Sequence, residues 1–303
     1  MTLKTFACLG VLLATTSFVD VAHAKTRPAA PVATPAAKQL PPRTTRHVVN
    51  VPALGGPFYY LAWRAPGVKA KGRYPLLVML HGLGGDPYGF FELGDMGNRL
   101  EKAVRSGKLP PCVAVIPEGR NGYWSNWVDG NNPYADLVTA HIVPAARSVL
   151  PVTRKASSTV IMGLSMGGFG ALSIGLRHPR TFGIIVALSP TDMEYAVQGS
   201  PRRKVYTNAF GLPIQMAAVR SANPFHLVKS GCGRGQTVLL SYGAREGRKF
   251  KQGTIRLAKV MRKAKMRVRV QSVAGGVHGW ASTWKQSHPW WIPRVGTMLK
   301  KAR

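Results

Sequence analysis

The stretch 163–167, with the sequence Gly-Leu-Ser-Met-Gly, has residue types and a spacing suited to covalent chemistry. The pattern Gly-x-Ser-x-Gly is typical of a serine nucleophile, here Ser165, on a sharp turn between a strand and a helix. The apolar run 159–162 predicts the strand, and residues 169–176 predict the helix. Glycines permit the close approach of the two backbones, and the helix N-terminus favours an oxyanion beside the serine.

A serine hydroxyl is a weak nucleophile and needs a base, which is itself oriented by an acid. His278 follows the last predicted strand and has a glycine close by on either side, so it is the predicted base. His81 also follows a strand, but it precedes the serine and is predicted to shape the turn there. Structural or solvated roles are expected for further histidines in helices or in the region 193–230: His141, His178, His226 and His288.

Glu246 is the only carboxylate in the loop after the predicted strand 237–241, where an orienting acid is expected. An ion pair with Arg245 or Arg248 is the alternative role for this side chain. Asp192, after the preceding strand, is the second candidate for the acid. The chain order serine, acid, histidine is the order found in α/β-hydrolases.

An oxyanion needs two backbone donors aimed at the developing negative charge. The N–H of Met166, directly after the nucleophile, is the first predicted donor. The N–H of Leu83, in the glycine-rich loop 81–85, is the second, because glycines let such a loop turn tightly with its N–H groups facing inward. The alternative is that this loop is only flexible.

The elements that must position these residues alternate between strands and helices from residue 46 to 303, which predicts one mostly parallel sheet with right-handed crossovers. The predicted strands are 46–53, 57–65, 74–80, 112–116, 159–162, 183–188, 237–241 and 267–273, the first two being antiparallel. The predicted helices are 95–106, 134–150 with an interruption at Pro144, 169–176, 254–265 and one at the C-terminus. Residues 193–230 lack clear periodicity and are predicted to form an insertion or lid over the site.

The N-terminal residues 1–24 have the features of a secretory signal peptide. Lys4 provides the positive end, residues 6–15 the apolar core, and Ala22-His23-Ala24 a cleavage site. We therefore expect export to the periplasm or the extracellular space. Residues 25–45 are rich in Pro and Ala and predict an extended linker.

The formal net charge of +31 is unusual for a chain of 303 residues. It favours an anionic polysaccharide or an anionic membrane surface as a partner, and a merely solubilising surface is the equal alternative. Nucleic acid is a poor candidate partner, because the sequence has no nucleic-acid-binding motif and export would separate the protein from most nucleic acid.

Three motifs together resemble the esterase D, or "Putative esterase", family of α/β-hydrolases. They are His-Gly-Leu-Gly-Gly at 81–85, Gly-Leu-Ser-Met-Gly-Gly-Phe-Gly-Ala-Leu at 163–172 and Gly-Val-His-Gly-Trp at 276–280, and the segment 178–190 is also similar. The resemblance spans residues 46–303 and implies an α/β-hydrolase fold.

That family includes tributyrin, feruloyl and acetylxylan esterases, S-formylglutathione hydrolase and the secreted mycolyltransferases. The resemblance implies Ser165 as nucleophile, His278 as base, and Leu83 and Met166 as oxyanion donors. Many members have Asp at the position of Glu246, whereas the mycolyltransferases are similar to this chain in using Glu.

The sheet order of the family also bears on two cysteines, Cys112 and Cys232. It implies a separation of about four strand spacings, roughly 19 Å, whereas a disulfide needs α-carbons within about 7 Å. We therefore expect no disulfide between them.

These observations predict a secreted serine carboxylic-ester hydrolase that works through an acyl-enzyme without a metal or organic cofactor. Its substrate would be a short-chain ester or an acylated carbohydrate. Trp124 and Trp127, with Tyr123, would stack on sugar rings beside the site, or would instead pack in the core. Two alternatives stay open: acyl transfer to a sugar hydroxyl, and a polyanion-binding cell-envelope protein on a hydrolase fold.

Overall fold

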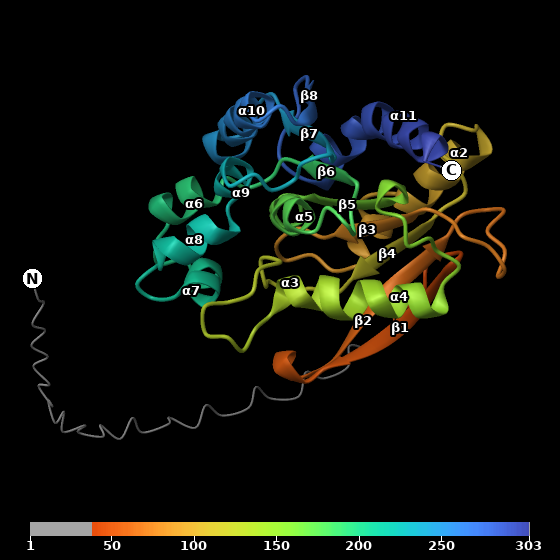
Figure 1. Ribbon diagram of the computed structural model, residues 1–303, viewed down its shortest axis with the longest axis horizontal. Coiled ribbons are helices and arrows are strands. Elements are labelled where there is room, and N and C mark those ends of the chain that lie inside the picture. Colours follow the sequence, from red (N-terminus) through yellow and green to blue (C-terminus); the bar gives the residue numbers. More distant parts are fainter. Residues whose placement is uncertain (1–37, 303) are drawn as a thin grey trace, which may run out of the picture. The chain divides into compact units, whose positions relative to one another are not determined.

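One eight-stranded sheet forms the centre of the protein in the computed structural model, which describes residues 38–302 (Figure 1). The strand order is β1-β2-β4-β3-β5-β6-β7-β8. The strands are β1 (Thr44–Val51), β2 (Gly56–Arg64), β3 (Leu76–Leu80), β4 (Val113–Pro117), β5 (Thr159–Leu164), β6 (Ile184–Leu188), β7 (Thr237–Gly243) and β8 (Arg267–Val273). β2 is antiparallel to both of its neighbours, β1 and β4, and all other neighbouring strands are parallel. The predicted mostly parallel sheet is confirmed.

The apolar composition of the central strands explains their position. Every residue of β3, β4, β5 and β6 is buried, as expected where helices cover both faces of a parallel sheet. The edge strand β8 instead alternates between exposed and half-buried residues over most of its length.

Helices pack on both faces of the sheet (Figure 1). They are α1 (Gly89–Glu92), α2 (Met96–Arg105), α3 (Tyr134–Asp136), α4 (Val143–Val149), α5 (Met166–Arg177), α6 (Met193–Gly199), α7 (Lys204–Phe210), α8 (Met216–Ala222), α9 (Pro224–Lys229), α10 (Arg248–Lys263) and α11 (Lys285–Lys301). Short 3-10 turns occur at Pro52–Leu54 and Ala156–Ser158, and π-helical turns at Leu137–Ile142 and Trp280–Trp284. Side chains of α4, α5 and α10 share one core with the sheet, and those of α2 and α11 share the other.

The helix between residues 134 and 150 shows how a proline is accommodated. Pro144 is the second residue of α4 and has no N–H group to donate to the preceding turn. The helix widens into a π-helical segment immediately before it, at Leu137–Ile142. The interruption predicted at Pro144 therefore takes the form of a register change in a continuous helix.

Residues 193–230, which the sequence predicted to form an insertion or lid, are largely helical. They form four short helices, α6 to α9, whose side chains Met193, Tyr206 and Val219 lie in the core. Each helix has only one or two turns, which is too short to show a clear 3.6-residue period. α9 packs against α5 and α10, so this region is part of the domain.

The predicted signal peptide 1–24 lies outside the described residues, as does most of the predicted linker 25–45. β1 begins at Thr44, slightly before the predicted start of the domain at residue 46. Lys38 already contacts the domain through an ion pair with Asp86.

Two further observations concern the cysteines and the lengths of the helices. No disulfide joins Cys112 and Cys232, and β4 and β7 are separated by β3, β5 and β6, as the family's sheet order implied. In the part of the chain that the structure describes, none of the helices is long and apolar enough to span a bilayer.

Candidate active site

Ser165 occupies the turn between β5 and α5, at the carboxyl end of the sheet. Its φ of 60° lies in the left-handed region, a conformation that costs about 1–3 kcal/mol for a residue with a side chain. The turn is held by the Ser165 N–H, which donates to the carbonyl of Leu188, and by the Ser165 carbonyl, which accepts from Phe169. This geometry matches the sharp strand-to-helix turn predicted from the glycine spacing.

The glycines on either side of Ser165 are required by crowding. A β-carbon at Gly167 would lie 1.9 Å from the carbonyl oxygen of Leu80, and one at Gly163 would lie 2.4 Å from the carbonyl of Gly167. The clashing atoms belong to the backbone, so no side chain can move aside to relieve them. Glycine at these positions lets α5 start directly against the end of β3.

His278 lies beside Ser165, in the loop that follows β8. Its Nε2 atom is 2.8 Å from the Ser165 hydroxyl oxygen, and its Nδ1 atom is 3.1 Å from Oε1 of Glu246. An ionised carboxylate only accepts hydrogen bonds, so Nδ1 carries the proton and Nε2 is left to accept the serine proton. The two hydrogen bonds thus fix the tautomer that a general base needs.

The carboxylate of Glu246 is fully buried in the loop between β7 and α10. Oε1 accepts hydrogen bonds from the hydroxyls of Ser189, at 2.6 Å, and Thr283, at 3.0 Å, while Oε2 accepts from the N–H of Gly243. Burial alone would raise the pKa of Glu246, but the hydrogen bonds from His278, Ser189 and Gly243 outweigh it and lower the pKa. The carboxylate is therefore held in its charged form.

The ring of Phe250, in the first turn of α10, stacks on the imidazole of His278. The two ring centroids are 3.8 Å apart and the planes are inclined by only 16°. The side chain of His278 is 33% exposed, so the phenyl ring covers one face while another side stays open to solvent. Phe250 thus restricts the rotation of the imidazole without closing access to it.

Both predicted oxyanion donors lie near Ser165. Met166 is the first residue of α5, and Gly82, the residue before Leu83, lies against the serine: a β-carbon built at Gly82 would be 3.6 Å from Cβ of Ser165. Within residues 38–302, the N–H groups of Met166 and Leu83 have no hydrogen-bond acceptor. Two unpaired donors beside a nucleophile are suited to an oxyanion.

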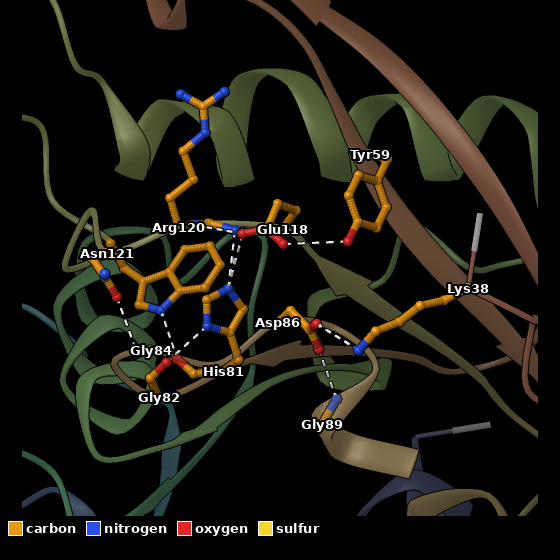
Figure 2. A network of polar contacts seen from close by, with 12 residues as sticks. Lys38, Tyr59, His81, Gly82, Gly84, Asp86, Gly89, Glu118, Arg120 and Asn121 are labelled. Atoms are coloured by element: carbon orange, nitrogen blue, oxygen red, sulfur yellow. Dashed lines mark hydrogen bonds and ion pairs between the residues drawn. The ribbon is translucent and has the colours of Figure 1, made fainter. Parts of the chain in front are cut away.

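The loop that carries Leu83 is fixed by a polar network (Figure 2). The buried ring of His81 accepts from the N–H of Gly119 at Nε2, so Nδ1 donates to the carbonyl of Gly82 at 2.9 Å. The amide oxygen of Asn121 accepts from the N–H of Gly84 at 2.8 Å. His81 therefore shapes the turn, as predicted, and the loop is not merely flexible.

Glu118 supports this network from the end of β4 (Figure 2). Its carboxylate accepts from the N–H of Arg120 and from the hydroxyl of Tyr59. Burial would raise the pKa of Glu118, but these bonds and the nearby ring of His81 lower it overall.

Asp192, the second candidate for the acid, is placed elsewhere. It is the N-cap residue of α6 and forms an ion pair with Arg256 of α10. Burial raises the pKa of Asp192 more than the guanidinium lowers it. Among the described residues, the ion-pair partner of Glu246 is His278 and not Arg245 or Arg248.

The predicted sugar-stacking role of Trp124 is wrong, because this side chain is completely buried. Its ring lies against Gly119 and Gly170, and its indole N–H donates to the carbonyl of His81. Tyr123 is also buried, between Phe169 and Tyr206. An aromatic loop has the same composition whether it faces a ligand or the core.

Trp127 has a different environment and is half-buried. Its indole N–H donates to the carbonyl of Gly122, and its ring lies 5.5 Å from that of Tyr134. Both contacts of Trp127 lie within residues 122–134.

The sequence-based prediction missed four residues that support the site: Ser189, Thr283, Phe250 and Asn121. Ser189 directly follows β6, so the rule that site residues follow parallel strands could have found it. The other three lie in helices or loops with no local signal. As for metals, residues 38–302 contain no cluster of three or more His, Cys, Asp or Glu side chains that could hold an ion.

Comparisons with known proteins bear on the family and the fold of the chain. The profile of the family described as "Putative esterase" matches residues 59–301. An acetyl esterase from Caldicellulosiruptor saccharolyticus is 37% identical over 99 residues, which cover 32% of this chain and 36% of that protein. The iron(III) enterobactin esterase of Escherichia coli (strain K12) is 28% identical over 91 residues, covering 30% of this chain and 23% of that protein. The chain thus aligns with about a third or less of the length of these curated relatives.

Solved structures share the fold over a longer span. A ferulic acid esterase superposes with a TM-score of 0.70 at 20% identity, covering 84% of this chain and 98% of that one. An S-formylglutathione hydrolase from Staphylococcus aureus has a TM-score of 0.67 at 15% identity, with the same coverage. At these identities the similarity establishes the α/β-hydrolase fold alone.

Proposed function

The chain belongs to the esterase family whose profile it matches, and on this premise we propose that it is a serine carboxylic-ester hydrolase that works through an acyl-enzyme. One observation carries the proposal: a continuous hydrogen-bonded chain runs from Glu246 through His278 to the hydroxyl of Ser165. This is the arrangement that makes a serine nucleophilic.

In the first half of the proposed reaction, Oγ of Ser165 attacks the ester carbonyl carbon while Nε2 of His278 takes the hydroxyl proton. The carbonyl oxygen becomes an oxyanion, which the N–H groups of Met166 and Leu83 stabilise. The buried carboxylate of Glu246 stabilises the imidazolium that forms. The tetrahedral intermediate then expels the alcohol, which receives the proton from His278, and the acyl group remains on Ser165.

In the second half, a water molecule gives a proton to His278 and attacks the acyl-enzyme. A second oxyanion forms in the same place and collapses to release the carboxylic acid, while Ser165 regains its proton. A base 2.8 Å from the nucleophilic oxygen is within reach for both proton transfers. The partly exposed edge of His278 is consistent with the entry of water in this half.

For the substrate, we propose a carboxylic ester with a short acyl group. Support comes from the acetyl esterase among the relatives, and an acylated saccharide remains within the proposal. Burial of Trp124 removes the stacking argument for a sugar. We also propose that the protein is exported to the periplasm or beyond, on the strength of residues 1–24.

Hydrolysis of p-nitrophenyl esters from acetate to octanoate tests the reaction. We expect activity that is greatest for short chains and is abolished in Ser165→Ala. A fluorophosphonate probe should add one covalent label to the wild-type protein and none to that variant. A wild-type protein that is folded, hydrolyses none of these esters and takes no label would overturn the proposal.

A second test distinguishes Glu246 from Asp192 as the acid that orients His278. Glu246→Gln keeps the size of the side chain but removes the charge beside His278, and we expect kcat to fall by roughly 10³–10⁴-fold. Asp192→Asn is the matched control, because that carboxylate lies on a neighbouring loop and bonds to Arg256. Equal losses in the two variants would contradict the assignment of the acid.

A further inference from the structure

A groove of about 880 Å³ lies between the edge of the sheet and α11. Its walls come from the first residues of β7 and β8 and from the C-terminal half of α11. Four cations line it: Arg267 and Arg269 of β8, with Arg294 and Lys301 of α11.

The strand register explains why the two strand cations point into the groove. Arg267 pairs with Thr237 and Arg269 with Leu239, and paired residues lie on the same face of a sheet. Leu239 belongs to the core on the face that α11 covers, so both arginines project towards that helix. Arg294 and Lys301 are two helical turns apart and lie on one side of α11.

No negative charge compensates these cations within the described residues. The lining contains no Asp or Glu, and none of the four side chains forms an ion pair. Arg267 and Arg294 donate to the carbonyls of Gly235 and Trp290, which are neutral acceptors. The sequence after Glu246 has no acidic residue at all, so the surrounding surface adds further positive charge. A concave site of one sign concentrates the electric potential.

We propose that this groove binds a linear anionic polysaccharide. Arg267 and Arg269 are separated by about 6.7 Å along the strand, so a chain with repeated carboxylate or sulfate groups can contact both. A guanidinium matches such groups with two parallel hydrogen bonds. The half-buried apolar side chains of Pro293 and Met298 in the lining offer contact to the C–H faces of sugar rings.

Other occupants fit this groove less well. A flat anionic bilayer does not fill a concave groove, and the lining has no aromatic ring on which nucleic acid bases would stack. A second copy of the chain carries the same charge of +31 and is repelled. Residues 1–37 contain Lys4, Lys25 and Arg27 against a single acid, Asp20, so this segment lacks the required charge as well.

The groove is remote from the reacting groups. Arg267 and Thr237 begin their strands, whereas Ser165 and His278 follow the ends of theirs. In a parallel arrangement these are opposite edges of the sheet. Polysaccharide binding would therefore hold the protein on a polymer while the candidate active site stays accessible.

Binding to heparin, as a sulfated probe, and to polygalacturonate, as a carboxylated probe, tests the proposal at several salt concentrations. The groove variant combines Arg267→Gln, Arg269→Gln, Arg294→Gln and Lys301→Gln. The matched control combines Arg154→Gln, Lys155→Gln, Arg202→Gln and Lys204→Gln, which removes the same charge from exposed side chains elsewhere.

We expect the groove variant to lose at least tenfold in affinity and to show a weaker salt dependence, while the control retains most of its affinity. Equal losses of affinity in both variants would show that binding depends only on the net charge of the protein, and would overturn the proposal. Tighter groove-dependent binding of poly-glutamate, an oligonucleotide or phosphatidylglycerol vesicles would also overturn it.

Two controls keep the result interpretable. Hydrolysis of p-nitrophenyl acetate should be unchanged in the groove variant, and binding should be unchanged in Ser165→Ala, so that loss of binding and failure of the proposed hydrolysis are distinguishable. If the fourfold variant does not fold, Arg267→Gln with Arg269→Gln suffices, because both side chains are exposed.

Discussion

The hydroxyl of Ser189 donates a hydrogen bond of 2.6 Å to Oε1 of Glu246, although the two residues lie 57 positions apart in the chain. Ser189 stands at the end of β6 with a φ of 46°, and Glu246 follows the neighbouring strand β7. The parallel pairing of these strands brings the two loops together. The carboxylate oxygen that contacts His278 is thus held by a residue from a second strand end.

Removal of this bond in Ser189→Ala should lower kcat by about tenfold, because hydrogen bonds to charged groups contribute about 1.5–3 kcal/mol. KM should change little, since Ser189 acts on the acid and not on the substrate. Steady-state kinetics on p-nitrophenyl acetate measures both constants. Thr283→Val and Thr283→Ser form a matched pair that tests the hydroxyl of Thr283. Thr283→Ser retains a hydroxyl and should keep most of the wild-type activity, whereas Thr283→Val should lose it. Wild-type activity in all three variants would show that the carboxylate of Glu246 needs neither hydroxyl.

The side chain of Asn121 should affect catalysis without touching the nucleophile. Its amide oxygen accepts from the N–H of Gly84 and so fixes the loop that presents the N–H of Leu83. Asn121→Ala should reduce kcat by roughly tenfold and leave KM almost unchanged, because an oxyanion donor acts mainly in the transition state. Asn121→Asp retains an acceptor oxygen and should recover part of the loss. A change in KM alone, with kcat unchanged, would contradict this role.

The crowded turn around Ser165 should make Gly167 intolerant of any side chain. The added methyl group of Gly167→Ala would lie 1.9 Å from the Leu80 carbonyl oxygen, so α5 must move away from β3. We expect a loss of more than about 4 kcal/mol in the free energy of unfolding. Gly199→Ala in α6 is the control, since nothing lies within 4 Å of its added carbon, and it should be neutral or slightly stabilising. Chemical denaturation of the two variants checks the difference.

The parts of the molecule that the sequence predicted correctly are those with a strong local pattern. The unbroken apolar runs of β3 and β5 indicated buried parallel strands. The glycine spacing around Ser165 indicated a sharp turn in which two backbone segments come close together. His278 and Glu246 could be found because parallel strands end at one edge of the sheet.

The parts that could not be predicted depend on contacts between distant segments. Thr283 reaches Glu246 only because the turn after His278 folds back over the loop after β7, and no local spacing encodes this. For Trp124 the sequence left both a ligand-facing and a core position open, because composition alone does not tell which side of a loop faces the core. The short helices α6 to α9 lack a period because each packs through only a few side chains.

Acidification should destabilise the protein through His288, which is buried in α11. Burial lowers the pKa of His288 to about 4 from its ordinary value of 6.5, and the hydrogen bond from Nδ1 to the Lys285 carbonyl only partly opposes this. The unfolded chain therefore binds a proton below pH 6.5 that the folded chain does not accept until about pH 4. The free energy of unfolding should fall across this window by up to about 1.4 kcal/mol per pH unit, roughly 3 kcal/mol in all. His288→Leu cannot bind that proton, so its stability should depend less steeply on pH. Urea denaturation at pH 7, 6, 5 and 4.5 measures both slopes, and parallel curves for the two proteins would show that His288 does not control the acid response.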